Sequence, residues 1–539
     1  MVNQLRHGKG IIQKTKSNVN QHRVLLCFGV LALVTLACSI GVLSPDDPIF
    51  TPPGNAGVKA TPDLIFPTDR PLSISEGAPI GGGGLPDTAF ATPTPVSTNG
   101  NRPLRLYDSQ AGDTLPVVAV RFAVEVSEIT SSLDPLPAES LLPPHTLLII
   151  PNKLANTTTQ QKILPDSELV YSPSAVDFDI EAYVNQAGGY LSTYSEWLGS
   201  TQWTTGAEVI QRIALDNSIN PRLLLALLEY QSGWVYGQPE DFAHRDYPLG
   251  LVDQSRKDLY KQLTWAINHL SVGFYGWREG LLTEIRFSDG VTARLAPDLN
   301  AGTVALQYYL SFVYDTPGWV EALDIESGLS ALYEQMFGNP WARAQEVEPL
   351  YPPDLTQPRL ILPFLIGQRW SYTGGPHGAW EHDGARAALD FAPGSTKPGC
   401  VDSQAWLVAM APGLIVRTGA GMIIQDLDGD GLEQTGWVLL YLHVSNMQVK
   451  PGDWVETSDL LGHPSCEGGT ATGTHLHIAR KYNGEWMPAG GPLPFTLNGW
   501  QAHAGLDPYD GILTRDGLTI YASVYGSHES LVARQRDDP

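Results

Sequence analysis

The chain has 539 residues, which is enough for about three or four folded domains rather than one. It carries 33 Lys and Arg against 57 Asp and Glu, for a net charge of −24. This acidic excess argues against binding to nucleic acid, whose phosphates require cations. Only 17% of the residues are charged and Trp and Tyr are plentiful, so the composition does not fit a wholly disordered chain.

The N-terminal residues 1–43 have the pattern of a signal or membrane anchor. The first 23 residues contain five basic and no acidic side chains, and Val24–Leu43 is an uncharged run of 20 residues. A helix of that length spans about 30 Å, the thickness of the hydrocarbon core of a membrane. The basic flank predicts that the chain after this segment lies outside the cytoplasm, at the cell surface or in the extracellular medium.

Two interpretations of this segment stay open. Residues 24–43 could remain as a transmembrane anchor, or they could be a signal that is cleaved, with lipid attached at Cys38. The second follows from Leu36-Ala37-Cys38, which resembles a bacterial lipobox. The next segment, 44–103, is rich in Pro and Gly, includes four consecutive Gly at 81–84, and is predicted to be a disordered linker.

Residues 104–153 contain the signals of a small α+β module. Gly112-Asp113-Thr114-Leu115 is a turn followed by a helix start, with Asp113 or Thr114 as the cap, and Leu147–Ile150 reads as a closing strand. These features resemble LysM, a βααβ module that binds the N-acetylglucosamine glycans of peptidoglycan or chitin. The resemblance implies glycan binding.

Residues 154–345 are predicted to be mainly helical. Pro221–Trp234 begins with Pro and is apolar on most faces, as expected of a buried helix. The segment resembles the lysozyme-like core of lytic transglycosylases, in which this helix ends in Glu-Ser. Gln231 stands at the Glu position here, and a carboxamide cannot donate a proton to a glycosidic oxygen. We therefore predict a non-catalytic domain.

Residues 346–515 are predicted to form an antiparallel, β-rich domain, and 516–539 a C-terminal tail. Short apolar or alternating runs bounded by Gly, Pro and Asp predict strands at Trp406–Met410, Gly413–Arg417, Met422–Gln425, Trp437–His443 and His475–Arg480. The whole chain is thus expected to be a multidomain α+β protein.

The β-rich segment also holds a set of metal-binding residue types. His377 follows Gly-Gly-Pro, Asp390 lies in an apolar run, His443 ends a predicted strand, and His475 and His477 flank Leu476. Residues i and i+2 of a strand point to one face, so the last two imidazoles should project together. Catalytic zinc takes three protein ligands and leaves a fourth position open, and imidazoles with one carboxylate meet that need.

This pattern resembles the lysostaphin/β-lytic zinc endopeptidases of LytM-like fold. The resemblance implies that His377, Asp390 and His477 bind zinc and that His443 and His475 are the catalytic pair. Most of that family has a His where Arg386 stands here, whereas the β-lytic branch takes its first ligand from a Gly-Gly-Pro-His loop. His382 is the alternative first ligand.

The resemblance predicts an exported endopeptidase that hydrolyses peptide bonds of bacterial peptidoglycan with a metal-activated water. The expected partners are peptidoglycan and, through the N-terminal segment, the membrane. The alternative is a non-catalytic protein that binds the cell wall or regulates an amidase; the complete ligand set favours the enzyme.

Two further features lie in the same domain. Cys400 and Cys466 are an even pair in an exported domain and predict a disulfide beside the metal site. Asp426, Asp428 and Asp430 alternate before Gly431, which resembles the start of a calcium loop, although Trp437 stands where an EF-hand has Glu. Calcium binding and a simple hairpin loop closed by Asp-Gly turns both stay open.

Overall fold

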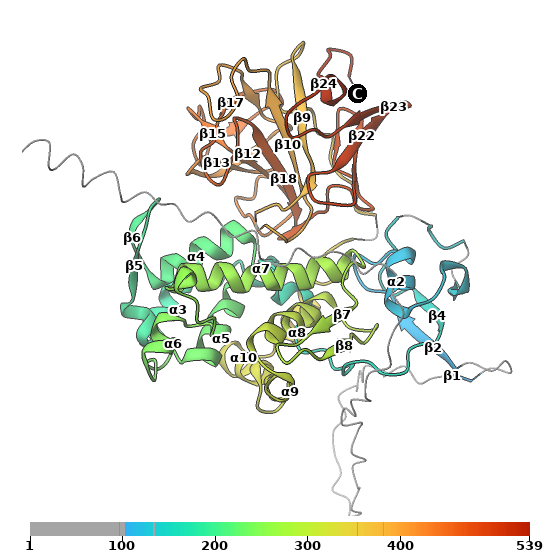
Figure 1. The fold of residues 1–539 in the computed structure, drawn as a ribbon, viewed down its shortest axis with the longest axis vertical. Coiled ribbons are helices and arrows are strands. Elements are labelled where there is room, and N and C mark those ends of the chain that lie inside the picture. Colours follow the sequence, from blue (N-terminus) through green and yellow to red (C-terminus); the bar gives the residue numbers. More distant parts are fainter. Residues whose placement is uncertain are drawn as a thin grey trace, which may run out of the picture. The chain divides into compact units, whose positions relative to one another are not determined.

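The computed structural model describes residues 96–97, 103–132, 135–138, 140–352, 354–380 and 382–538 (Figure 1). The predicted membrane segment Val24–Leu43 and most of the predicted linker lie outside the described residues. Among the helices of the described part, none is long and apolar enough to cross a membrane.

The first module is a small sheet with one helix packed on it. Its strands are β1 (Val96–Ser97), β2 (Pro103–Asp108), β3 (Thr130–Ser131) and β4 (Leu147–Pro151), in the order β1-β2-β4-β3. Helix α2 (Leu115–Phe122) begins at Thr114, whose side chain accepts the Val117 N–H. The predicted strand and one of the two predicted caps are thereby confirmed. Where the βααβ pattern has its second helix, the described residues have a 3₁₀ turn, η1 (Val126–Glu128).

The middle segment is helical around a buried helix α5 (Pro221–Ser232), as its apolar sequence predicts. Pro221 opens this helix and the Asn220 side chain caps it by accepting the Arg222 N–H. Two hairpins lie between the helices, β5 (Ser195–Leu198) with β6 (Gln202–Thr205) and β7 (Glu284–Arg286) with β8 (Thr292–Arg294). The other helices are α3 (Ile180–Ala187), α4 (Gly206–Asn217), α6 (Phe242–Asp246), α7 (Leu259–Arg278), α8 (Ala301–Val313), α9 (Thr316–Ala322), α10 (Leu329–Phe337) and α11 (Pro340–Val347).

The C-terminal segment is built on one large antiparallel sheet, in the order β16-β12-β13-β14-β18-β10-β9-β24. Smaller sheets have the orders β11-β17-β15 and β20-β21-β22-β23, and β19 pairs with β18. The strands are β9 (Arg369–His377), β10 (Ala388–Pro393), β11 (Leu407–Val408), β12 (Gly413–Gly419), β13 (Met422–Asp426), β14 (Trp437–Leu442), β15 (Val444–Ser445), β16 (Trp454–Val455), β17 (Leu460–Pro464), β18 (Leu476–Tyr482), β19 (Glu485–Trp486), β20 (Thr496–Leu497), β21 (Trp500–Ala504), β22 (Gly511–Arg515), β23 (Leu518–Tyr521) and β24 (Leu531–Ala533).

The five predicted strand positions are all occupied by strands, and the α+β, β-rich expectation is confirmed at that level. We predicted a separate C-terminal tail at 516–539, but this segment is part of the β-rich domain. It supplies β23 and β24, and β24 pairs with β9 at the edge of the large sheet. Val532 is fully buried in the core of this domain, which explains why the segment is ordered.

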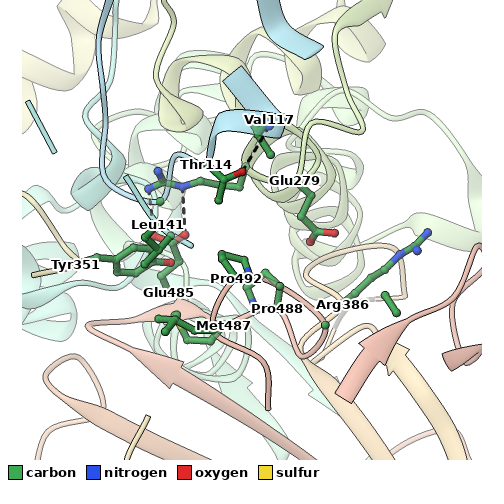
Figure 2. A pocket seen from close by; sticks show the side chains of 16 residues that line it. Thr114, Val117, Leu141, Glu279, Tyr351, Arg386, Glu485, Met487, Pro488 and Pro492 are labelled. Carbon is green, nitrogen blue, oxygen red and sulfur yellow. Dashed lines mark hydrogen bonds and ion pairs between the residues drawn. The ribbon is translucent and has the colours of Figure 1, made fainter. Parts of the chain in front are cut away.

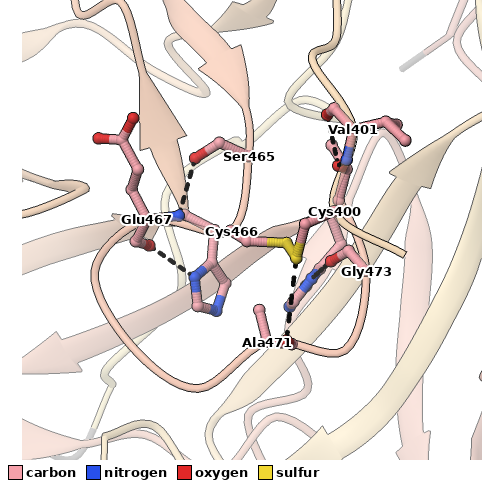
Figure 3. Close-up of a disulfide and its surroundings, with 10 residues drawn as sticks. Cys400, Val401, Ser465, Cys466, Glu467, Ala471 and Gly473 are labelled. Atoms are coloured by element: carbon pink, nitrogen blue, oxygen red, sulfur yellow. Dashed lines mark hydrogen bonds between the residues drawn. A yellow bond between two sulfur atoms is a disulfide. The ribbon is translucent and has the colours of Figure 1, made fainter. Parts of the chain in front are cut away.

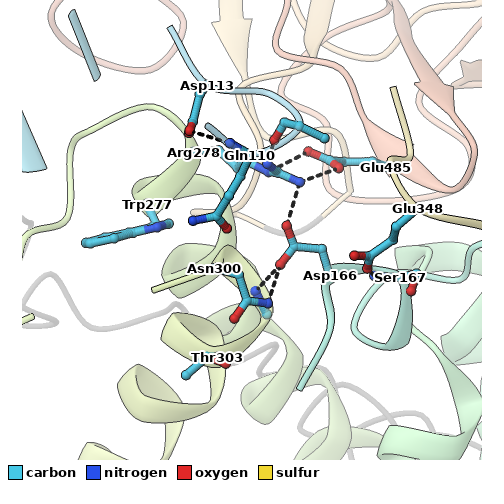
Figure 4. A network of polar contacts seen from close by, with 12 residues as sticks. Gln110, Asp113, Asp166, Ser167, Trp277, Arg278, Asn300, Thr303, Glu348 and Glu485 are labelled. Atoms are coloured by element: carbon cyan, nitrogen blue, oxygen red, sulfur yellow. Dashed lines mark hydrogen bonds and ion pairs between the residues drawn. The ribbon is translucent and has the colours of Figure 1, made fainter. Parts of the chain in front are cut away.

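A buried arginine joins the three segments (Figure 4). Arg278, the last residue of α7, makes ion pairs with Asp166 at 2.9 Å and with Glu485 of β19 at 3.2 Å. Its guanidinium also donates to the carbonyl of Ala111 in the first module. One side chain therefore contacts the small module, the helical segment and the β-rich domain.

The β18–β19 hairpin is a second point of contact between the helical and β-rich parts. Gly484 in its turn has a φ of +80°, and a Cβ added there would meet the carbonyl of Tyr171 at 2.1 Å. Ser218, which follows α4, donates to the Gly484 carbonyl at 2.7 Å. Beside the hairpin, Arg417 pairs with Asp216 of the helical segment and, at 2.6 Å, with Glu433.

We expect the substitution Arg278→Met to destabilise the protein strongly. It would leave the carboxylates of Asp166 and Glu485 buried without their cation, at a cost of about 3–5 kcal/mol in the free energy of unfolding. Urea unfolding of the full chain measures this. Arg286→Met on the exposed edge of β7 is the matched control and should leave the unfolding midpoint unchanged; equal midpoints for the two variants would contradict the expectation.

Candidate metal centre

Three adjacent strands bring the predicted metal ligands onto one face of the large sheet. In the register of β10, Asp390 stands opposite His477 of β18, and Ala388 stands opposite His377 of β9. Residues 388 and 390 of one strand share a face, so the three side chains are directed to the same side. On the opposite face, Leu389 and Phe391 are buried in the hydrophobic core and fix the strand.

The ligand atoms of these residues meet at one point. The Nε2 atom of His377 and the Nδ1 atom of His477 lie 3.3 Å and 3.2 Å from Oδ1 of Asp390, and 3.1 Å from each other. All three side chains are buried. They form the His/Asp/His group expected of a metal site.

Hydrogen bonds to carbonyl oxygens set the tautomers of the two imidazoles. Nδ1 of His377 lies 2.7 Å from the carbonyl of Gly375, and Nε2 of His477 lies 2.9 Å from the carbonyl of Ala379. A carbonyl can only accept, so these nitrogens carry the protons and the other nitrogen of each ring presents a lone pair to Asp390.

Oδ1 of Asp390 is buried and has no hydrogen-bond partner. Two imidazole lone pairs and a carboxylate oxygen therefore converge in a buried site. They repel one another there unless a cation lies between them. Two nitrogens and one carboxylate oxygen are a donor set that suits zinc.

The predicted catalytic pair lies beside this point. The ring centroids of His443 and His475 are 4.4 Å apart, and Nε2 of His475 is 3.8 Å from Oδ1 of Asp390. Each ring holds its Nδ1 at 2.7 Å from a carbonyl, of Glu467 and Gly473 respectively, so both present Nε2. Burial, together with the neighbouring His475, lowers the pKa of His443 to about 4.

The predicted disulfide between Cys400 and Cys466 is confirmed (Figure 3). Cys466 directly precedes Glu467, whose carbonyl holds the ring of His443. On the other side, Thr474 hydrogen-bonds to the N–H and carbonyl of Val401, 2.7 and 2.6 Å away, next to Cys400. The bridge thus ties together the two loops that orient the predicted catalytic pair, His443 and His475.

The alternative first ligand is not part of the group. His382 has 84% of its side chain exposed and pairs with Asp383 at 2.7 Å, so the structure brings His377 rather than His382 to the site. Arg386, at the position where most of the resembled family has a His, donates to the carbonyl of Leu506 instead.

Sequence reasoning missed one residue of the site. Tyr509 stacks on the ring of His377, with centroids 4.1 Å apart and planes within 20°. Its backbone has a φ of +71°, and its carbonyl accepts the Gly375 N–H at 2.8 Å. The only sequence signal is the turn-like Pro508-Tyr509-Asp510-Gly511, which does not point to a metal site.

The acidic loop between β13 and β14 satisfies its carboxylates internally. Asp426 accepts N–H groups of Asp428, Gly429 and Gly431, and Asp430 accepts the hydroxyl of Thr435 at 2.6 Å. These hydrogen bonds explain why the loop forms a closed hairpin. The three carboxylates are close enough to share an ion. Calcium binding by this loop stays a prediction.

Several known proteins are similar to this chain. A family model described as "LasA, N-terminal domain" matches residues 162–351. Protease LasA of Pseudomonas aeruginosa is 27% identical over 359 residues, which cover 62% of this chain and 78% of that protein. Beta-lytic metalloendopeptidase of Achromobacter lyticus is 26% identical over 167 residues, covering 30% of this chain and 42% of that one.

Among solved structures, the M23 metalloprotease pseudoalterin is 26% identical, with a TM-score of 0.27, and the alignment covers 31% of this chain and 96% of that one. By its sequence similarity to Protease LasA and to beta-lytic metalloendopeptidase, the chain is a homologue of these proteases. More particularly, it is a LasA-like protein, because its similarity to Protease LasA covers most of that protein and a LasA N-terminal model matches the helical segment. The LysM-like and lysozyme-like resemblances stay predictions.

We expect Gly374→Ala to disturb the metal site. Gly374 stands opposite Asp390 in the sheet, and a Cβ there would meet Oδ2 of Asp390 at 2.6 Å. The carboxylate must then move, which we expect to weaken zinc affinity by about 10–100-fold. Competition with a fluorescent zinc chelator measures this. Gly394→Ala, whose Cβ would meet nothing within 4 Å, is the control, and equal affinities in the two variants would refute the expectation.

Proposed function

We propose that this protein is a zinc-dependent endopeptidase that hydrolyses peptide bonds in bacterial peptidoglycan. The observation that carries the proposal is the convergence of two imidazole lone pairs and one unpartnered carboxylate oxygen on a single buried point. The homologous proteins are proteases by name, and one is a β-lytic enzyme. A complete donor set argues against a purely wall-binding or amidase-regulating role.

In this proposal His377, Asp390 and His477 hold the zinc. When bound, zinc polarises the carbonyl of the scissile peptide bond and lowers the pKa of a water molecule to about 7. The buried ring of His443 is neutral at neutral pH and presents Nε2 as a proton acceptor. The ring of His475 lies beside it with Nδ1 held by the Gly473 carbonyl, and once this ring is doubly protonated its Nε2–H donates a hydrogen bond to the oxygen that becomes negative.

The cell wall is the proposed partner, and export of the chain follows from it. The disulfide is consistent with an oxidising compartment. The N-terminal segment would serve as a signal, as a lipid-attachment site or as a membrane anchor. The first module and the helical segment would then hold the peptidase on the glycan strands.

Two substitutions should separate metal binding from proton transfer. We expect His477→Ala to lose bound zinc and all hydrolysis, and His443→Ala to keep zinc while hydrolysis falls by about 10²–10⁴-fold. Metal analysis of the purified full chain and mass spectrometry of peptides released from defined muropeptides measure the two effects. His382→Ala should change neither, since that ring is exposed. Hydrolysis by a zinc-free His477→Ala protein would overturn the proposal.

Removal of the metal should also lower stability. The ligand atoms repel one another without a cation, so zinc binds the folded state more tightly than the unfolded chain. With free zinc at 100 times its dissociation constant, binding contributes about 2.7 kcal/mol. Thermal unfolding with a chelator and after zinc is restored would report this, and the same pair of measurements on the His477→Ala variant is the control. An unchanged midpoint would argue against the assigned site.

A further inference from the structure

The β5–β6 hairpin presents two tryptophans to solvent. Trp197 and Trp203 are directly opposite each other in its register, so they share one face. Their exposed fractions are 59% and 69%. The ring centroids lie 5.9 Å apart at an interplanar angle of 84°, so the two indoles are in an edge-to-face arrangement.

The opposite face of the hairpin is fixed to the helical segment. Glu196 and Thr204 are buried there, and the Glu196 carboxylate accepts the Tyr260 N–H of α7 at 2.8 Å. In the turn, Ser200 accepts a hydrogen bond from Arg212 of α4 at 2.6 Å. These anchors prevent the hairpin from rotating to bury its indoles, so the exposure is built into the fold.

Packing of the two rings on each other does not explain this exposure. The packing of two rings across a strand pair stabilises less than the full burial of a large apolar side chain. Solvated strand faces ordinarily carry polar side chains. A rigid pair of indoles held open to water is instead typical of a binding surface.

The chemistry around the pair favours an uncharged polysaccharide. The exposed side chains that flank the pair on the same face are neutral hydrogen-bonding groups, Ser195 and Thr205, which stand opposite each other in the register. The nearby cation, Arg212, is already engaged by Ser200 and by Asp216 at 3.5 Å. With a chain charge of −24, an anionic membrane surface would be repelled rather than attracted.

We propose that Trp197 and Trp203 form a glycan-binding site for N-acetylhexosamine strands such as those of peptidoglycan. One indole stacks on the apolar face of a pyranose ring, the other borders its edge, and Ser195, which shares this face of the hairpin, reaches its hydroxyl or amide groups. The choice of glycan rests on the proposed function. The site lies in the helical segment, in a hairpin separate from the metal centre.

Binding is tested with the full chain carrying His477→Ala, so that the wall is not degraded. Trp197→Leu and Trp203→Leu keep an apolar cross-strand contact but lack an aromatic face. We expect each to bind insoluble peptidoglycan and soluble chito-oligosaccharides about tenfold more weakly. Trp203→Tyr keeps an aromatic face and should stay within about threefold of the parent. Trp454→Leu, at an exposed Trp of the β-rich domain, is the matched control and should bind as the parent does.

Thermal unfolding confirms that the variants are folded. Equal glycan affinity in the parent and the two Leu variants would overturn the proposal, as would equal weakening by Trp203→Tyr and Trp203→Leu. Loss of binding to anionic lipid vesicles without loss of glycan binding would also overturn it and assign the surface to a membrane. Hydrolysis of a soluble muropeptide by protein without the His477 substitution is measured separately, so failure of the peptidase proposal leaves this test intact.

Discussion

The convergence of three electron-pair donors on one buried point is the constraint on which the β-rich domain depends. Such an arrangement is unfavourable by itself, because carbonyl oxygens hold the protons of both neutral rings on their far sides and the ring lone pairs face the Asp390 carboxylate. The fold therefore commits the site to a cation. Pairing of β10 with strands on both sides and the absence of a side chain at Gly374 make this commitment geometrically possible.

Strand β18 connects that site to the rest of the molecule. One end of the strand supplies His477, and the other end turns into the hairpin that Ser218 and the Tyr171 carbonyl hold. The strand pairs with β14 from His477 to Tyr482 and with β10 from Leu476 to Ala479. The contact between the helical segment and Gly484 therefore lies at the end of the same strand that carries the predicted ligand His477.

Sequence alone predicted the parts of this structure that have strong local signals. The five histidine and aspartate positions could be found because their motifs are compact, and helix α5 because Pro221 and its apolar faces are unambiguous. Tyr509 could not be found, since its stacking on His377 depends on how a distant turn packs. The strands of 516–539 were missed because short edge strands such as β24 gain their stability from the pairing partner rather than from their own pattern. The buried network around Arg278 could not be predicted from the sequence either, because its partners are far apart in the chain.

The disulfide between Cys400 and Cys466 makes assembly of the active site depend on redox conditions. The carbonyl that orients His443 belongs to the residue after Cys466, and Thr474, which precedes His475, is tied to the residue after Cys400. In a reducing compartment both loops lose their shared covalent tether, and the two imidazoles lose their common frame. The proposed hydrolase would therefore be complete only in a compartment where thiols are oxidised, and a reducing cell interior would hold it in an inactive form.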